Sequence, residues 1–190
     1  LALACLICTL LIGLPAAYGL ARHPGWLSRL LEEFISLPLA VPGLALALAL
    51  LQLYGSMKGF RASWTFILVG HVLYTLPFMV RSILAVLAAM DLKTLEEGAA
   101  SLGASPWQRF RDIVVPNAMP GILAGALTVV TLSIGEFNLT WMLHTPYLKT
   151  LPVGLADSYA SMRLEIASAY TLVFFIMIVP LLMAMQWASA

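Results

Sequence analysis

Polar and ionisable side chains inside long apolar runs are the residues of this chain that could do chemistry. His71, Glu136 and Asn138 lie in such runs. Ionisable groups are costly in a membrane-spanning helix and often mark the path of a solute or proton. Counting from the outer ends of the predicted spans, at 1.5 Å per residue, places His71 about 10 Å and Glu136 about 9 Å deep. We therefore predict that these residues line the outer part of a solute path or its gate. The alternative is a buried pair that only holds two helices together.

Three other possible sites have simpler explanations. Arg81 would lie about 25 Å into its span, near the inner interface, where an arginine can snorkel. That depth is too far from Glu136 for the two to pair. Cys5 and Cys8 have CxxC spacing but no polar neighbours, so we expect ordinary packing rather than metal or redox chemistry. No HExxH or GxxxxGK[ST] motif occurs, so we expect no enzyme, no bound metal or cofactor and no ATP site in this chain.

The composition requires a membrane. Of the 190 residues, 62% are hydrophobic and 10% charged, and the mean hydropathy is +0.96. A soluble domain carries roughly 25% charged residues. Apolar runs of about 20 residues cross a bilayer as helices, because lipid leaves the backbone to bond within its own segment. The predicted fold class is therefore an all-α polytopic membrane protein. A net charge of +1 without a basic run gives no support for nucleic-acid binding.

About five spans must position these residues. We predict them near residues 1–20, 34–54, 64–90, 119–143 and 167–187, with a charged loop at 91–117 and an external loop at 144–166 that contains a helix over 155–164. Pro38 and Pro42 in the second span require a kink, or cover from neighbouring helices. Because the chain starts at Leu1 without a basic leader, we expect an earlier helix in the whole protein. A cytoplasmic 91–117 loop gives a slight positive-inside bias.

The 91–117 loop contains the capping and terminating residues of two short helices. Thr94-x-x-Glu97 and Ser105-x-x-Gln108 both match the capping-box pattern. Thr94 is predicted to cap the first helix, and Gly103 to end it in a left-handed conformation. Ser105 should cap the second helix, with Pro106 at its first position, and this helix should end near residue 115.

Small residues in the first short helix, Ala99 and Ala100, leave room for another surface to approach closely. Charged residues on both sides could set the register of that surface, namely Glu96, Glu97, Arg109, Arg111 and Asp112. We predict a docking surface for a partner in the cytoplasm. A solvated loop that merely joins two spans is the alternative.

The loop resembles the Glu-Ala-Ala-x3-Gly-x9-Ile-x-Leu-Pro signature of the permease subunits of binding-protein-dependent ABC importers. Gly98 replaces the first alanine of that signature and Val115 replaces its leucine. The matching residues are Glu97, Ala99, Gly103, Ile113 and Pro116, and the resemblance implies that these residues, together with Ala100, couple the permease to its ATPase.

The resemblance extends along the chain and implies a type I importer fold. It further implies two cytoplasmic ATP-binding subunits that hydrolyse ATP, a second permease copy or a paralogue, an extracytoplasmic solute-binding protein and a bacterial inner membrane. The stretches 135–138 and 151–158 are similar to the phosphonate, polyamine and ferric-ion group. Residues 161–166 are similar to permeases for 2-aminoethylphosphonate, which is the expected solute. Polyamine, ferric iron, sulfate and thiamine are alternatives. A secondary carrier or channel is the remaining alternative, although the chain shows no internal repeat.

Overall fold

Helices make up the chain in the computed structural model, which describes residues 1–189. Four helical stretches are long and apolar enough to cross a membrane: Ala2–Arg22 (α1), Trp64–Ala88 (α5), Pro106–Gly135 and Leu164–Ala184 within α11 (Leu164–Ser189). The stretch from Pro106 comprises α7 (Pro106–Arg109), a π-helical turn η1 (Phe110–Val114) and α8 (Val115–Gly135). Within the described residues the structure contains no β-strand, so the predicted all-α membrane class is confirmed.

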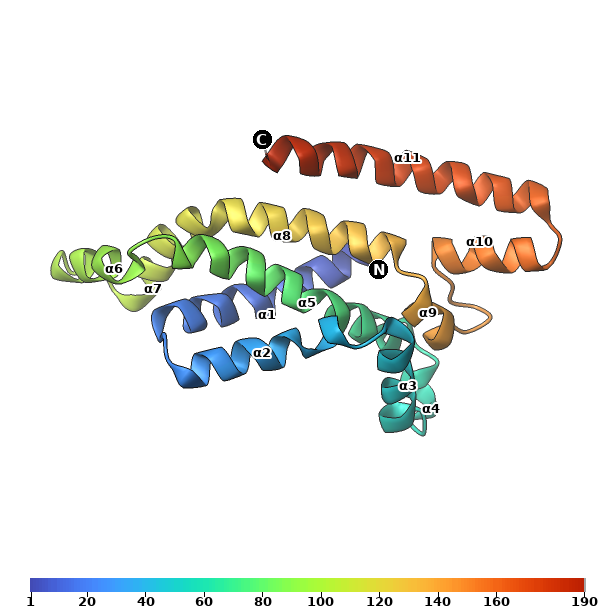
Figure 1. Cartoon of the computed structure of the whole chain (residues 1–190), viewed down its shortest axis with the longest axis horizontal. Helices are drawn as coiled ribbons and strands as arrows, with labels where there is room; N and C mark the ends of the chain where they lie inside the picture. Colours follow the sequence, from blue (N-terminus) through green and yellow to red (C-terminus); the bar gives the residue numbers. More distant parts are fainter. Residues whose placement is uncertain (190) are drawn as a thin grey trace.

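Six shorter helices complete the chain. Helices α2 (Trp26–Ala40) and α3 (Gly43–Tyr54) precede α4 (Lys58–Arg61), and α6 (Leu92–Ser101) precedes α7. Helices α9 (Asn138–Leu143) and α10 (Leu151–Ala160) precede α11. In Figure 1 the long helices run along the molecule, with α6 and α7 at one end and α3, α4, α9 and α10 at the other.

Two separate hydrophobic cores hold the bundle. The larger core joins α1, α5 and α8, with Met79 and Ile83 of α5 fully buried in it. A Cβ at Gly121 of α8 would lie 2.6 Å from the Ser82 carbonyl oxygen of α5. Glycine therefore lets these two helix backbones approach more closely than any side chain would allow. The smaller core joins α3, α5 and α9 through Ala47, Leu50, Phe66, Ile67, Leu139 and Leu143.

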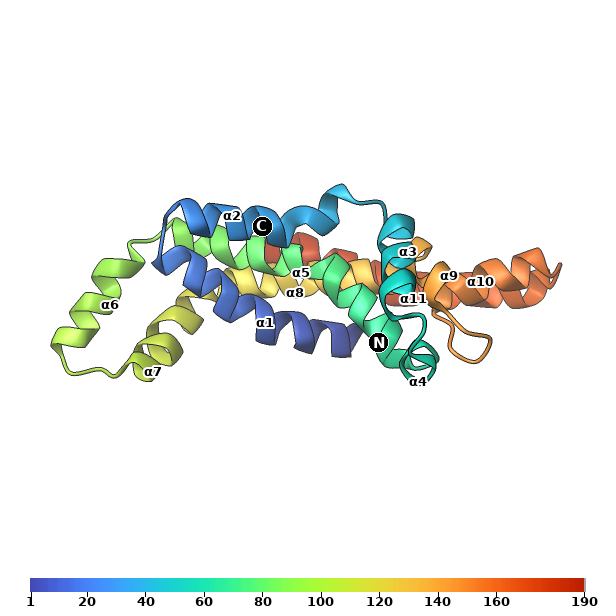
Figure 2. The same ribbon diagram turned by 90° about the horizontal axis from the view of Figure 1, so that it is seen from below.

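The predicted span at 34–54 is a bent pair of helices, α2 and α3, which together are long and apolar enough to count as a fifth span. Helix α2 starts earlier, at Trp26, and is bent from α3 by 104°. Figure 2 shows α3 standing across the direction of α2. The bend lies at Val41 and Pro42, where proline disfavours helical backbone in the residue before it. Val41 is extended, with φ −98° and ψ 126°.

The predicted span at 119–143 is wrong at both ends. Helix α8 stops at Gly135, and α9 is a separate short helix. At the other end, the second loop helix does not stop near Val115, because the turn η1 joins it to α8. The wider π-helical turn changes the hydrogen-bond register just before Pro116, which cannot donate a backbone bond. Pro116 then lies in the first turn of α8.

The external segment differs from the prediction in its helix boundaries. The expected helix over 155–164 is α10, which begins earlier, at Leu151, and ends at Ala160. The chain then turns at Met162, which has a φ of +57°. Helix α11 begins directly afterwards at Leu164, three residues before the expected start of the last span.

Candidate functional site

The loop between α5 and α8 forms a sharp elbow from its two short helices. Gly103 lies between them with a φ of +86°, as its position in the sequence predicts. The Ser105 hydroxyl accepts a hydrogen bond from the Gln108 backbone N–H at 3.3 Å. The Gln108 side chain accepts one from the Ser105 backbone N–H at 2.7 Å. This reciprocal capping box and the position of Pro106 are confirmed.

The predicted cap at Thr94 is wrong. Helix α6 begins at Leu92, and the Asp91 carboxylate accepts the Thr94 backbone N–H at 3.2 Å. Side-chain and backbone hydrogen bonds from Thr94 hold the pKa of Asp91 below its usual value. Aspartate caps a helix as readily as threonine and adds a favourable charge at the helix N-terminus, so the earlier residue takes this position.

The residues of the elbow far from the membrane helices, here called its tip, are exposed, and those next to the membrane helices, here called its roots, are buried. At the tip, Leu102 is 90% exposed and Trp107 67% exposed. The motif residues Glu97, Ala100, Gly103 and Pro116 are also exposed, whereas Ala99 and Ile113 are half-buried. At the roots, Leu92 and Val114 are buried in the larger core. An apolar tip on a buried base has the form of a docking surface.

A hollow of about 370 Å³ separates the two arms of the elbow. Ala99, Gly103 and Ala104 line it together with the polar side chains of Gln108 and Arg109. The Nε atom of Arg109 is buried and has no hydrogen-bond partner among the described residues.

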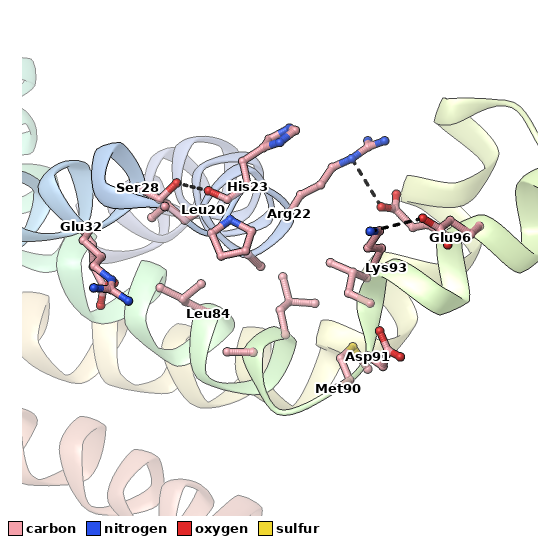
Figure 3. Close-up of a pocket in the computed structure, with 18 of the residues that line it drawn as sticks. Leu20, Arg22, His23, Ser28, Glu32, Leu84, Met90, Asp91, Lys93 and Glu96 are labelled. Atoms are coloured by element: carbon pink, nitrogen blue, oxygen red, sulfur yellow. Dashed lines mark hydrogen bonds and ion pairs between the residues drawn. The ribbon is translucent and has the colours of Figure 1, made fainter.

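A larger cavity, of about 680 Å³, lies where the loop meets the membrane helices. Figure 3 shows it between the turn from α1 to α2, the end of α5 and the start of α6. Two ion pairs form between residues that line this cavity. Arg22 Nε lies 3.5 Å from Glu96 Oε2, and Lys93 Nζ lies 3.8 Å from Glu97 Oε1.

Glu96 has a role that the motif does not indicate. Its side chain is only 5% exposed, whereas that of the motif residue Glu97 is 67% exposed. Leu92 and Glu96 are one helical turn apart and form the buried face of α6. Recognising this face from the sequence would require the helix to start at Leu92 instead of after Thr94.

A second candidate site lies at the opposite end of the bundle, around His71. Its imidazole is fully buried. The Nδ1 atom lies 2.9 Å from the Ser133 hydroxyl and Nε2 lies 2.7 Å from the Thr140 hydroxyl. The Thr140 hydroxyl donates its own proton to Glu136 Oε2 at 2.9 Å. Nε2–H must therefore donate to Thr140, which leaves Nδ1 to accept from Ser133 in the neutral ring.

Glu136 caps the short helix α9. Its carboxylate accepts the backbone N–H groups of Leu139 at 2.8 Å and Thr140 at 2.9 Å. At the other end of α9, the Arg61 guanidinium donates to the Leu143 carbonyl at 2.8 Å. A carboxylate at the N-terminus and a cation at the C-terminus both interact favourably with the dipole of this helix and stabilise it. The short helix after the break at Glu136 is thus stabilised at both of its ends.

The structure joins His71 and Glu136 through Thr140 rather than directly. Asn138 is exposed and has no part in these contacts. Thr140 and Ser133 were not predicted, because hydroxyl side chains occur throughout apolar helices and carry no spacing signal. Arg81 is exposed on α5 and makes no ion pair with Glu136. Within the described residues no group of three or more His, Cys, Asp or Glu side chains could hold a metal ion.

Comparison with known proteins gives one family match. The model of the family described as "Binding-protein-dependent transport system inner membrane component" matches residues 9–189. A putative 2-aminoethylphosphonate transport system permease protein, PhnV of Salmonella typhimurium, is 29% identical over 179 residues. That alignment covers 93% of this chain and 66% of the relative.

Other relatives carry different solute names. A probable sulfate transport system permease protein of Chlorella vulgaris is 31% identical, with 67% of this chain and 52% of the relative covered. The molybdenum transport system permease protein ModB of Haemophilus influenzae is 33% identical, with 65% and 59% covered. The chain thus spans between half and two thirds of the length of these curated relatives.

One solved structure has the same fold. It is described as inward-facing conformations of the MetNI methionine ABC transporter, and its matching chain superposes with a TM-score of 0.79 at 18% identity. The match covers 97% of this chain and 88% of that chain.

Proposed function

The chain belongs to the family of inner-membrane components of binding-protein-dependent transport systems, and on this premise we propose that it couples an ATPase to the uptake of 2-aminoethylphosphonate. In the proposed complex, two cytoplasmic ATP-binding subunits hydrolyse ATP. This chain and a second permease copy or paralogue form the solute path across the bacterial inner membrane. An extracytoplasmic solute-binding protein delivers the solute.

The elbow between α6 and α7 carries the docking part of the proposal. Leu102 and Trp107 form its exposed apolar tip, and Gly103 sets its angle. Its bases are buried against the membrane helices, so a force applied to the tip reaches the bundle. A flexible connecting loop would need neither the capping box nor the buried roots. We therefore assign Glu97, Ala99, Ala100, Ile113 and Pro116 to the ATPase contact together with Gly103.

The hydrogen-bonded side chains of His71, Glu136 and Thr140 are assigned to the outer gate of the solute path. His71, Glu136 and Thr140 fasten α9 at the level where α2 bends into α3. Because His71 is fully buried in the single chain, its proposed role in the path is to hold α9, not to touch solute. The exposed side chain of Asn138 in the same helix is assigned to face the solute.

The external segment 144–166 is the proposed contact for the solute-binding protein. Its helix α10 is held to the preceding turn by Lys149, which bonds the Asp157 carboxylate. This hydrogen bond keeps the pKa of Asp157 below its usual value. Tyr147 and Tyr159 are strongly exposed on this segment, and exposed aromatic side chains are common anchors in protein interfaces.

The choice of solute rests on coverage. The relative named for 2-aminoethylphosphonate aligns with 93% of this chain, whereas the sulfate relatives align with 66% to 82% of it and the molybdenum relative with 65%. The test is ATP hydrolysis by the complex in nanodiscs, with its cognate ATPase and binding protein. We expect 2-aminoethylphosphonate to stimulate hydrolysis and sulfate, molybdate, thiamine, putrescine and ferric iron not to.

The outcomes separate the two parts of the proposal. Stimulation by one of the other solutes would overturn the phosphonate assignment and leave the importer in place. If the cognate ATPase did not co-elute with the permease at all, the docking assignment would be wrong. The matched control is Gly103→Asp, which should abolish stimulation by every solute.

A further inference from the structure

Helix α6, the first arm of the elbow, is joined to α1 by a closed ring of three polar side chains, those of Tyr18, Arg22 and Glu96. Tyr18 of α1 donates its hydroxyl proton to Glu96 Oε1 at 2.5 Å. Arg22, one turn further along α1, donates from Nη1 to the Tyr18 oxygen at 2.7 Å. Its Nε lies 3.5 Å from Glu96 Oε2. Figure 3 shows the Arg22 and Glu96 side chains reaching toward each other beside the cavity. A buried carboxylate needs such partners, because losing one leaves an uncompensated charge.

The second arm of the elbow reaches the same residue by aromatic contact. The Phe110 ring of η1 lies 5.3 Å from the Tyr18 ring, centroid to centroid. Trp107 of α7 stacks on Phe110 at 5.8 Å. Trp107 is also part of the exposed tip, so a row of three rings connects the tip to α1. Both arms of the elbow therefore converge on Tyr18, one through its hydroxyl group and the other through its ring.

Glu97 provides the contrast. Among the residues that the structure describes, its only ion pair is with Lys93 of the same helix, and both side chains are exposed. A surface pair at this spacing contributes little and links no second element. Glu96, the residue beside it, makes the connection to a different helix.

Helix α1 in turn is closely packed on α5. A Cβ at Gly13 would lie 2.9 Å from Met79 Cγ. Nearer the outer end, Cys5 Sγ lies 3.2 Å from the Thr75 hydroxyl. A displacement of α1 is therefore passed to α5, which also carries His71.

We propose that Tyr18 is the point at which both arms of the elbow are fastened to α1, with Glu96 and Arg22 as positioning residues. Movement of the elbow is thereby delivered to α1. This assignment rests on the proposed docking of an ATPase at the elbow. It makes Glu96, and not the neighbouring Glu97 of the motif, the residue that transmits the movement within the chain.

The experiment measures whether α6 and α1 move as one body. Spin labels are placed at Leu11→Cys on α1 and Leu95→Cys on α6, both exposed positions, in a Cys5→Ser, Cys8→Ser background. Labelled permease is diluted with unlabelled permease and assembled with the cognate ATPase in nanodiscs. Distances between the labels are recorded without nucleotide and after trapping with ATP and vanadate.

We expect one narrow distance distribution that trapping leaves unchanged in the parent protein and in Lys93→Gln, which removes the surface ion pair of Glu97. In Glu96→Gln and Tyr18→Phe, trapping should split or broaden the distribution, because α6 then moves without α1. Tyr18→Phe removes only the hydroxyl group and keeps the ring against Phe110. Arg22→Gln is the second variant if Glu96→Gln does not assemble, since Arg22 is 38% exposed and less costly to change.

Two results would overturn the fastening. One is an unchanged distribution in both Glu96→Gln and Tyr18→Phe while the complexes still hydrolyse ATP. The other is an equal change in Lys93→Gln. Failure of the parent permease to co-elute with the ATPase is a different result, which would overturn the proposed function and the transmission with it.

Discussion

His71 Nε2 lies 2.7 Å from the hydroxyl of Thr140, and this contact ties the short helix α9 to the N-terminal third of the long helix α5. The two residues are 69 positions apart in the chain. Thr140 also donates to Glu136, so a single hydroxyl group connects the imidazole to the carboxylate that caps α9. The break after α8 is thus stabilised by contacts to another helix and not only by its own backbone.

Thr140→Val should destabilise the protein. It keeps the shape of the side chain but leaves the buried His71 N–H without an acceptor, which costs about 1–3 kcal/mol. Thermal unfolding in detergent measures the loss. Thr128→Val is the matched control, because the Thr128 hydroxyl bonds only the Ala124 carbonyl of its own helix. Equal shifts for the two variants would show that the His71 contact contributes nothing.

Glu136→Gln should loosen α9. A carboxylate accepts with two oxygens, and here they take the N–H groups of Leu139 and Thr140. Glutamine has one acceptor oxygen, so one N–H loses its partner. We expect faster hydrogen exchange in α9 and reduced transport, with exchange in α5 unaltered. Normal transport and normal expression of this variant would rule out a role for Glu136 in the path or its gate.

Gly121→Ala should force α5 and α8 apart. The added Cβ would lie 2.6 Å from the Ser82 carbonyl oxygen, which is backbone and cannot rotate away. Overpacking of this kind typically costs about 1–3 kcal/mol. Gly135→Ala is the control, since a Cβ there meets nothing within 4 Å. The midpoint of thermal unfolding should fall for Gly121→Ala and stay close to the parent for Gly135→Ala.

Gly103→Asp should leave membrane insertion intact and abolish binding of the ATPase. The φ of +86° at this position strains any side chain, although the space around it is open. The elbow would open and its tip would no longer present Leu102 and Trp107 together. Co-elution with the cognate ATPase is the measurement. Gly98→Ala, in the interior of α6, should bind normally, and retained binding by Gly103→Asp would remove the docking assignment.

Local sequence determined much of the fold. Apolar length was enough to locate α1, α5 and α11, because a helix in lipid must satisfy its own backbone. The elbow was also readable, since Ser105, Gln108 and Gly103 act on backbone groups within three residues of themselves. The motif that these residues belong to was sufficient to predict the family.

Features that depend on contacts between residues far apart in the sequence were decided only by the tertiary structure. Pro42 indicates a kink locally, but the sequence reports neither its angle of 104° nor the break at Glu136, because α3 and α9 are stabilised by each other and by α5. Composition likewise cannot distinguish Glu96 from Glu97. One residue of offset on a helix turns a side chain by about 100°, from solvent to the interior. Tyr18, 78 residues away, is what makes the buried position tolerable for Glu96.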